Sequence, residues 1–183
     1  MINVQLILEL ALLSVFNLTT EEKGLNADVF LEKLKSWELM NENNFTIISV
    51  GVRSFFNEDS ISSLHVLVPQ FEVCVRHMFV KAGAATSSIK KGMAQHEETF
   101  NEFLKREDVI QSLGDAVHKY IQFVMVEQSG MNLRNNIAHG LIKAEACNKS
   151  INVLVLHLFL VLTIYGLPTN YLELRVQKMP KSR

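Results

Sequence analysis

Helix-breaking residues are rare in this chain, and their scarcity limits the folds that the chain can adopt. Only three prolines and eight glycines occur among 183 residues, so long regular elements with few breaks are expected. Apolar residues recur at the spacing of a helix face, and hydrophobic residues make up 48% of the chain, which supplies a core. We therefore predict an all-α fold, a helical bundle without a β-sheet.

The segment from Asn26 to Met40 shows the helical pattern most clearly. Phe30, Leu34 and Trp37 fall at positions i, i+4 and i+7, which places them on one side of a helix. The side chain of Asn26 is suited to cap the first turn of this helix. We expect the helix to bury its apolar side.

Four further segments carry weaker signals. Residues 3–16 are largely apolar and predict a buried helix. Residues 60–81 predict a long helix, and residues 99–112 predict a short one. Residues 45–57 contain several β-branched residues, so their composition is compatible with a strand as well as with a helix.

Residues 151–167 are the segment that most resembles a membrane span. They are 17 residues long and mostly Leu, Val, Ile or Phe, which is the lower limit for crossing a bilayer. Asn152, His157 and Thr163 interrupt the apolar run, and a helix that is apolar all round is also typical of a bundle centre. We therefore favour a buried helix over a membrane span, with His157 as a core histidine that has one hydrogen-bond partner.

The net charge is −1, so the chain as a whole shows no preference for a polyanion. Any contact with RNA must come from a local basic cluster. Lys90 and Lys91 lie in a small, polar stretch at residues 82–96 that predicts a loop, and they are candidate substrate-binding residues.

The two cysteines, Cys74 and Cys147, are too few for a disulfide framework and indicate a reducing compartment, the cytoplasm. Cys74 and His77 have the spacing of two zinc ligands, but a zinc site needs further ligands that the sequence does not place nearby. We predict no metal site.

The run Arg134-Asn135-Asn136-Ile137-Ala138-His139 offers the most distinctive chemistry of the chain. A guanidinium can hold a phosphate through two parallel hydrogen bonds, and an imidazole can move a proton near neutral pH. Arg134, Asn135 and His139 are therefore the candidate catalytic residues. The alternative interpretation is the end of a helix, with Arg134 and His139 near the last turn and Gly140 as the residue that terminates it.

We expect Asp115 to cap the helix that leads toward this run, with Gly130 as a point where the helix bends or ends. On a continuous helix Asn135 and His139 share one face at i, i+4, so the amide is placed to orient the imidazole. Arg134 lies about 140° away from His139 around the axis. The same polar face would carry two candidate substrate-binding residues, Gln128 and Asn132. The opposite face would be the core side, formed by Phe123, Val126, Leu133, Ile137 and Leu141.

Residues 132–140 resemble the Arg-polar-x3-His signature of the HEPN superfamily (higher eukaryotes and prokaryotes nucleotide-binding domain). Residues 55–59 and 63–76 are similar to the first long helices of one HEPN subfamily, whose domain also occurs in the endoplasmic reticulum membrane-associated RNA degradation protein. The resemblance covers residues 45–168 and favours a helix at its start. It implies a HEPN-like bundle at residues 44–168, preceded by an N-terminal helical extension at 1–43 and followed by a polar tail at 169–183.

The resemblance also implies a function: metal-independent endoribonuclease activity on single-stranded RNA, in which the RNA 2′-OH is the nucleophile and no cofactor takes part. Two protomers would pair as a symmetric homodimer so that both motifs face one cleft. Glu72 and Arg76 would form a helix ion pair behind the site residues. Such enzymes serve as toxins or antiviral effectors, which implies a cognate antitoxin or other regulatory partner. Position 141 is Leu141, where some HEPN toxins carry a tyrosine that a partner enzyme modifies.

Two alternatives to the nuclease remain open at this point. Some HEPN domains are catalytically inactive and act as nucleotide-binding, RNA-binding or scaffold modules. The chain would alternatively be a plain helical structural domain if Arg134 and His139 are core or capping groups.

Overall fold

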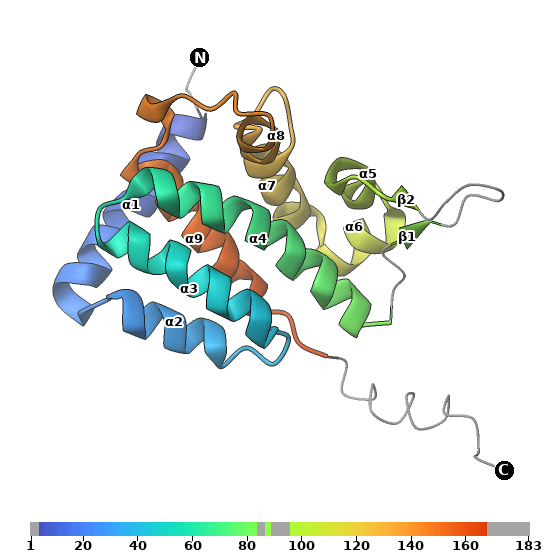
Figure 1. Cartoon of the computed structure of the whole chain (residues 1–183), viewed down its shortest axis with the longest axis horizontal. Helices are drawn as coiled ribbons and strands as arrows, with labels where there is room; N and C mark the ends of the chain where they lie inside the picture. The colour runs from blue at the N-terminus through green and yellow to red at the C-terminus, as the bar shows by residue number, and fades with distance from the viewer. Residues whose placement is uncertain (1–3, 84–86, 89–95, 168–183) are drawn as a thin grey trace, which may run out of the picture.

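The computed structural model describes residues 4–83, 87–88 and 96–167, and it confirms the all-α prediction (Figure 1). Its helices, in chain order, are α1 (Val4–Lys23), α2 (Ala27–Lys35), α3 (Glu42–Phe56), α4 (Ser60–Lys81), α5 (Phe100–Leu104), α6 (Glu107–Leu113), α7 (Asp115–Met125), α8 (Leu133–Ala138), the 3-10 turn η1 (Ala144–Ala146) and α9 (Lys149–Leu162). Within the described residues, the β-structure is one antiparallel pair of two-residue strands, β1 (Ser87–Ser88) and β2 (His96–Glu97).

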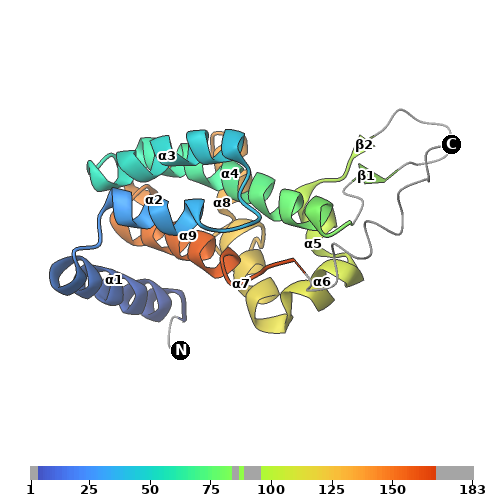
Figure 2. The same cartoon turned by 90° about the horizontal axis from the view of Figure 1, so that it is seen from below.

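Helix α1 lies on the outside of the bundle against α9, so the expectation of a buried helix at residues 3–16 is wrong (Figure 2). The side that packs on the core is only partly buried and consists of Leu8, Leu12, Leu13 and Phe16. The other side is apolar as well, yet it is exposed: Leu10 is 54% and Val15 is 60% accessible. Because both sides of α1 are apolar, the sequence pattern alone does not show how much of the helix is covered.

The Asn26 cap is confirmed, since its side chain accepts hydrogen bonds from the backbone N–H groups of Asp28 and Val29. Phe30, Leu34 and Trp37 are buried as predicted, although α2 ends at Lys35, before Met40. The indole N–H of Trp37 donates to the carbonyl oxygen of Tyr165 over 2.7 Å. This bond ties the segment after α2 to the segment after α9.

Helices α3 and α4 lie along each other and form one wall of the bundle (Figure 1). The segment at residues 45–57, which was compatible with a strand or a helix, is helical as the HEPN resemblance favoured. Gly51 allows the close approach of the two helices, because a Cβ at this position would lie 2.7 Å from Cγ of Leu67. Pro69 is accommodated inside α4, which continues to Lys81.

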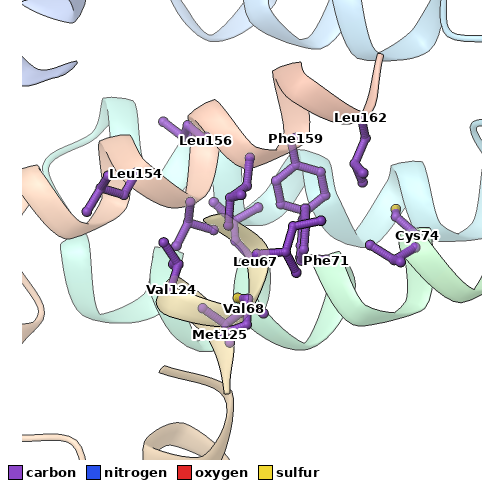
Figure 3. Packing of buried hydrophobic residues seen from close by; sticks show 14 of the residues in the cluster. Leu67, Val68, Phe71, Cys74, Val124, Met125, Leu154, Leu156, Phe159 and Leu162 are labelled. Atoms are coloured by element: carbon purple, nitrogen blue, oxygen red, sulfur yellow. The ribbon is translucent and has the colours of Figure 1, made fainter. Parts of the chain in front are cut away.

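Helix α9 forms the centre of the core, as favoured for residues 151–167. The ring of Phe159 meets the ring of Phe71 from α4 edge to face, with 5.5 Å between the ring centres (Figure 3). Val124 and Met125 of α7 complete this layer (Figure 3). Of the helices in the described residues, none is both long and apolar enough to cross a membrane.

His157 is the half-buried histidine with a single side-chain partner that the sequence predicted. Its Nδ1 lies 3.1 Å from the hydroxyl of Tyr120 on α7. Burial lowers the pKa of His157 below its ordinary value, because a charged imidazole would lose contact with water there. The neutral ring can accept the hydrogen bond from Tyr120.

The predicted helix at residues 99–112 is divided into α5 and α6. Phe100, Phe103 and Leu104 of α5 are buried, and the cap of α5 is a reciprocal pair of bonds between Thr99 and Glu102. The break falls at Lys105 and Arg106, and α6 then buries Val109 and Leu113.

The expectations for the helix before the motif need two corrections. Asp115 is the first residue of α7 rather than its cap, which is Gly114 at a left-handed φ of 75°. The helix ends at Met125, and a turn at residues 126–132 separates it from α8, so residues 123–141 are not one helix. Gly130 lies in this turn, where a Cβ would collide with the carbonyl oxygen of Phe123.

The N-terminal helices are in contact with the rest of the bundle, α1 with α9 and α2 with α3. The boundary expected at residue 44 falls in the first turn of α3, and the domain division itself stays a prediction. The expected polar tail at 169–183 lies outside the described residues.

Candidate functional site

Helix α8, which carries the Arg134–His139 run, is short and held at both ends. Asn132 precedes it in the left-handed conformation, with φ 50° and ψ 35°. The side-chain amide of Asn136 donates to the backbone carbonyl oxygen of Met131 over 3.1 Å. The backbone carbonyl oxygen of Asn136 accepts a hydrogen bond from the N–H of Leu141 over 2.7 Å. Gly140, with φ 65°, follows the helix as predicted for a terminating residue. The site is therefore positioned by its flanking turns as much as by the helix.

Arg134 is tied to α4 by an ion pair with Glu72. Its Nε donates to Oε2 of Glu72 over 3.0 Å, while the other carboxylate oxygen, Oε1, accepts from Nη2 of Arg76 over 2.9 Å. The predicted ion pair of Glu72 with Arg76 is present, and one carboxylate serves two guanidinium groups. The Glu72 and Arg76 side chains are only 16% and 18% exposed, against 31% for Arg134, so Arg134 is the more accessible of the two arginines.

Arg76 is held from the other side by the segment around α5. Its Nη2 donates to the carbonyl oxygen of Glu98 over 2.7 Å. The guanidinium carbon lies 5.0 Å from the ring centre of Phe103 and 5.8 Å from that of Phe100, which are cation–π distances. These contacts hold Arg76, and through it Glu72, in one position.

A pocket of about 480 Å³ opens between α4 and α8 beside this ion-pair group. Helix α8 contributes Arg134 and Ala138 to its wall, and α4 contributes Glu72, Arg76, His77 and the four aliphatic residues Val68, Pro69, Val73 and Val80. Burial and the nearby Lys81 lower the pKa of His77. The Nε2 atom of His77 is buried and has no hydrogen-bond partner among the residues that the structure describes.

Sequence reasoning did not single out this pocket, although its residues on α4 follow a helical spacing. Pro69, Val73, Arg76 and Val80 fall at i, i+4, i+7 and i+11, which is one face of a helix. Such a face, with an arginine between aliphatic residues, was the signal that could have located the pocket.

His139 is the C-cap residue of α8 and is exposed. Its backbone N–H donates to the carbonyl oxygen of Asn135 over 3.0 Å, and its ring has no hydrogen bond or ion pair within the described residues. The Asn135 amide does not orient the imidazole as expected. Instead it donates to Oδ1 of Asn132 over 2.7 Å and accepts from Arg134 at 3.4 Å.

The structure thus joins some predicted site residues and separates others. Arg134, Asn135, Asn132, Glu72 and Arg76 form one continuous set of polar contacts. Gln128 is exposed in the turn between α7 and α8, so the single polar helix face that grouped it with His139 does not exist. Lys90 and Lys91 lie outside the described residues.

The part of the chain that the structure describes contains no group of three or more His, Cys, Asp or Glu side chains placed to hold a metal ion. Burial raises the pKa of the Cys74 thiol to about 12, so this cysteine is a poor source of thiolate.

Comparisons with models of protein families, with curated proteins and with solved structures found no match. The HEPN resemblance therefore stays a prediction that rests on the motif residues.

Proposed function

We propose that this chain is a metal-independent endoribonuclease that cleaves single-stranded RNA. The observation that supports this most is the arrangement at α8: Arg134 lines an open pocket with its guanidinium held by Glu72, and the exposed His139 follows five residues later. Cleavage through the RNA 2′-OH requires two groups: a cation positioned to bind the phosphate, and an imidazole in contact with solvent.

The reaction would proceed by transfer of the RNA phosphate to its own ribose. An unprotonated imidazole at His139 takes the proton of the 2′-OH, and the 2′-oxygen forms a bond to phosphorus. The bond from phosphorus to the 5′-oxygen breaks, and a protonated imidazole gives its proton to that oxygen. The products are a 2′,3′-cyclic phosphate and a free 5′-hydroxyl.

Arg134 would stabilise the charge that develops on the non-bridging phosphate oxygens. Its Nε is already occupied by Glu72, so the phosphate would bind at the terminal nitrogens. Removal of one such contact typically costs about 3–4 kcal/mol in the transition state, or a few hundredfold to a thousandfold in rate.

One imidazole does not serve easily as base and acid in the same step, so the proposal includes a two-fold homodimer. His139 of one protomer would act as the base and His139 of the partner subunit as the acid. Light scattering at micromolar concentration should therefore give twice the 20.8 kDa mass of the chain. A monomer at all concentrations would contradict the paired site.

The biological setting that fits such an enzyme is a cytoplasmic toxin or antiviral effector, controlled by an antitoxin or other regulatory partner.

A binding module for RNA or nucleotides is the second candidate. It is favoured by the state of the two site residues: the charge of Arg134 is compensated by Glu72, and no described side chain orients the ring of His139. A site of this kind could hold a phosphate without cleaving it.

The deciding experiment compares cleavage of labelled single-stranded RNA by the full chain and its variants in excess chelator. Arg134→Ala and His139→Ala should each abolish most cleavage. Two matched controls are Arg53→Ala, which removes an exposed arginine paired with Asp28, and His65→Ala, which removes an exposed histidine of α4. Both controls should cleave like the wild type.

The nuclease proposal fails if wild type and His139→Ala cleave equally, or if cleavage stops in chelator. In either case RNA binding by the wild type and by Arg134→Ala, measured by filter retention, would then test the binding module.

A further inference from the structure

The pocket between α4 and α8 combines an open aliphatic wall with a charged end. Val73 is 40% and Val80 is 50% exposed, so both present apolar surface to the pocket mouth rather than to the core. Pro69 lies on the same side of α4 and is exposed as well. An aliphatic wall of this kind favours contact with a flat or apolar group, and it offers neither a hydrogen bond nor a charge to a bare anion.

The charged end carries one positive charge in excess. Arg76 and Arg134 bring two guanidinium groups, and Glu72 compensates one of them. Both oxygens of Glu72 already accept hydrogen bonds from these arginines, so the carboxylate is occupied and the accessible group is the guanidinium of Arg134. A ligand that fits this end bears a negative charge.

The ligand must therefore join an anionic group to a flat, largely apolar group. At about 480 Å³ the pocket lies within the range of small-molecule sites and has room for a single nucleotide. We infer that this pocket binds one nucleotide of an RNA strand, with its base against Val73 and Val80 and its phosphate at Arg134. This inference rests on the proposed ribonuclease function and adds a base-binding subsite to it.

The first test measures binding of adenosine 5′-monophosphate by isothermal titration calorimetry. This probe has no phosphodiester bond and cannot be cleaved, so binding is measured independently of catalysis. It should bind about tenfold or more tightly than ribose 5-phosphate, which has the same phosphate without a base. Equal affinities for the two probes would show an anion site only and would overturn the inference.

The second test fills the pocket without touching the charged residues. Val73→Trp and, independently, Val80→Trp should weaken binding of adenosine 5′-monophosphate about tenfold or more. The matched control is Val50→Trp on α3, at a valine that is 57% exposed and outside the pocket, and it should bind like the wild type. Circular dichroism of each variant checks the fold. Wild-type affinity in both pocket variants would overturn the inference.

The third test separates an RNA strand from a free nucleotide as the natural ligand. For cleavage of a short oligoribonucleotide, Val73→Trp should raise KM with kcat nearly unchanged. Unchanged KM together with lost mononucleotide binding would assign the pocket to a free nucleotide and contradict the RNA subsite.

The two proposals fail in different ways. If the wild type binds adenosine 5′-monophosphate at the pocket but cleaves no RNA, the ribonuclease function and the subsite for cleaved RNA both fall, and a nucleotide-binding module remains. If the wild type cleaves RNA but Val73→Trp changes neither KM nor nucleotide binding, only the base-binding subsite is wrong.

Discussion

Nε of Arg134 donates to Oε2 of Glu72 over 3.0 Å, although the two residues are 62 positions apart in the chain. The bond connects α8 to the middle of α4, and Arg134 lines the pocket while its Nη1 donates to Oδ1 of Asn135 at 3.4 Å. The carboxylate is held in turn by Arg76, which lies against Phe103. The orientation of the motif arginine therefore depends on a helix outside the motif.

Replacement of Glu72 by alanine should lower the free energy of unfolding by about 1–3 kcal/mol, because two partly buried guanidinium groups lose their shared partner. Urea denaturation measures the change. The control is Asp28→Asn, which removes the ion pair with Arg53; these side chains are 81% and 56% exposed. Such an exposed pair contributes about 0–1 kcal/mol. If Glu72→Ala costs no more than this control, the shared carboxylate does not stabilise the fold.

Gly130→Ala should destabilise the protein by about 1–3 kcal/mol, because the new Cβ meets the carbonyl oxygen of Phe123. At Gly140, by contrast, no atom of the described residues would obstruct a Cβ, but φ is 65°. Gly140→Ala should cost about 1–2 kcal/mol, and Gly140→Asn less, since asparagine tolerates this conformation. At Gly130 asparagine should be no better than alanine. Thermal unfolding that shows rescue by asparagine at both positions would contradict the steric explanation.

The stability of the protein should fall as the pH falls below 6.5, partly because of His157. Burial lowers its pKa in the folded state below the ordinary value of 6.5. In this window the unfolded chain binds a proton that the folded protein does not, so the unfolding free energy is highest above pH 6.5 and decreases below it. One such group contributes at most about 1.4 kcal/mol per pH unit.

Urea denaturation at pH 7.5 and at pH 5.5 measures this effect. His157→Gln should show a smaller loss between the two pH values than the wild type. Tyr120→Phe, which removes the hydrogen bond but keeps the imidazole, should retain the pH dependence and lose about 1 kcal/mol at both pH values. An unaltered pH dependence in His157→Gln would rule out this histidine as a contributor.

Substitutions on the two sides of α1 should lower the free energy of unfolding by different amounts. The ring of Phe16 meets that of Phe55 edge to face, with 5.3 Å between ring centres, so Phe16→Ala should cost about 1–3 kcal/mol. Val15 is 60% exposed, and Val15→Ala should stay within about 0.5 kcal/mol of the wild type. Equal costs in thermal denaturation would show that the exposed side is covered in solution.

If the chain is a ribonuclease, the Arg134→Ala/His139→Ala double variant should cleave RNA about as slowly as the slower single variant. Both residues act on one transition state, so their effects on rate do not add. The two single variants should differ in their free energy of unfolding. His139 is exposed, so His139→Ala should leave this free energy nearly unchanged, whereas Arg134→Ala should lower it because Glu72 keeps only one partner. Additive rate losses, measured with labelled RNA, would argue for independent roles.

Much of the fold could be predicted from local patterns in the sequence. The spacing of Phe30, Leu34 and Trp37 and the Asn26 cap defined the start and the buried side of α2, because both effects act within one or two helical turns. The interrupted apolar run at residues 151–167 indicated a core helix. The position of His157 within this run predicted a core histidine with one hydrogen-bond partner, which is Tyr120.

The candidate site was predicted only in part. Residues 134–138 do lie on one short helix, with His139 as its C-cap and Gly140 directly after it. The prediction that the same helix reaches back to Gln128 was wrong. A turn follows Met125, so residues before and after it do not share the face of one helix. No local pattern showed that the Asn135 amide would bond to Asn132 instead of His139.

Local sequence patterns were enough to predict a helical fold, the Asn26 cap and the residues that offer chemistry, since these depend on neighbours within a few positions. The contact of Glu72 with Arg134, the pocket between α4 and α8 and the exposed side of α1 became visible only in the folded structure. These relationships join segments far apart in the chain. They follow from how the helices pack around α9, which depends on the shapes of all the buried side chains together.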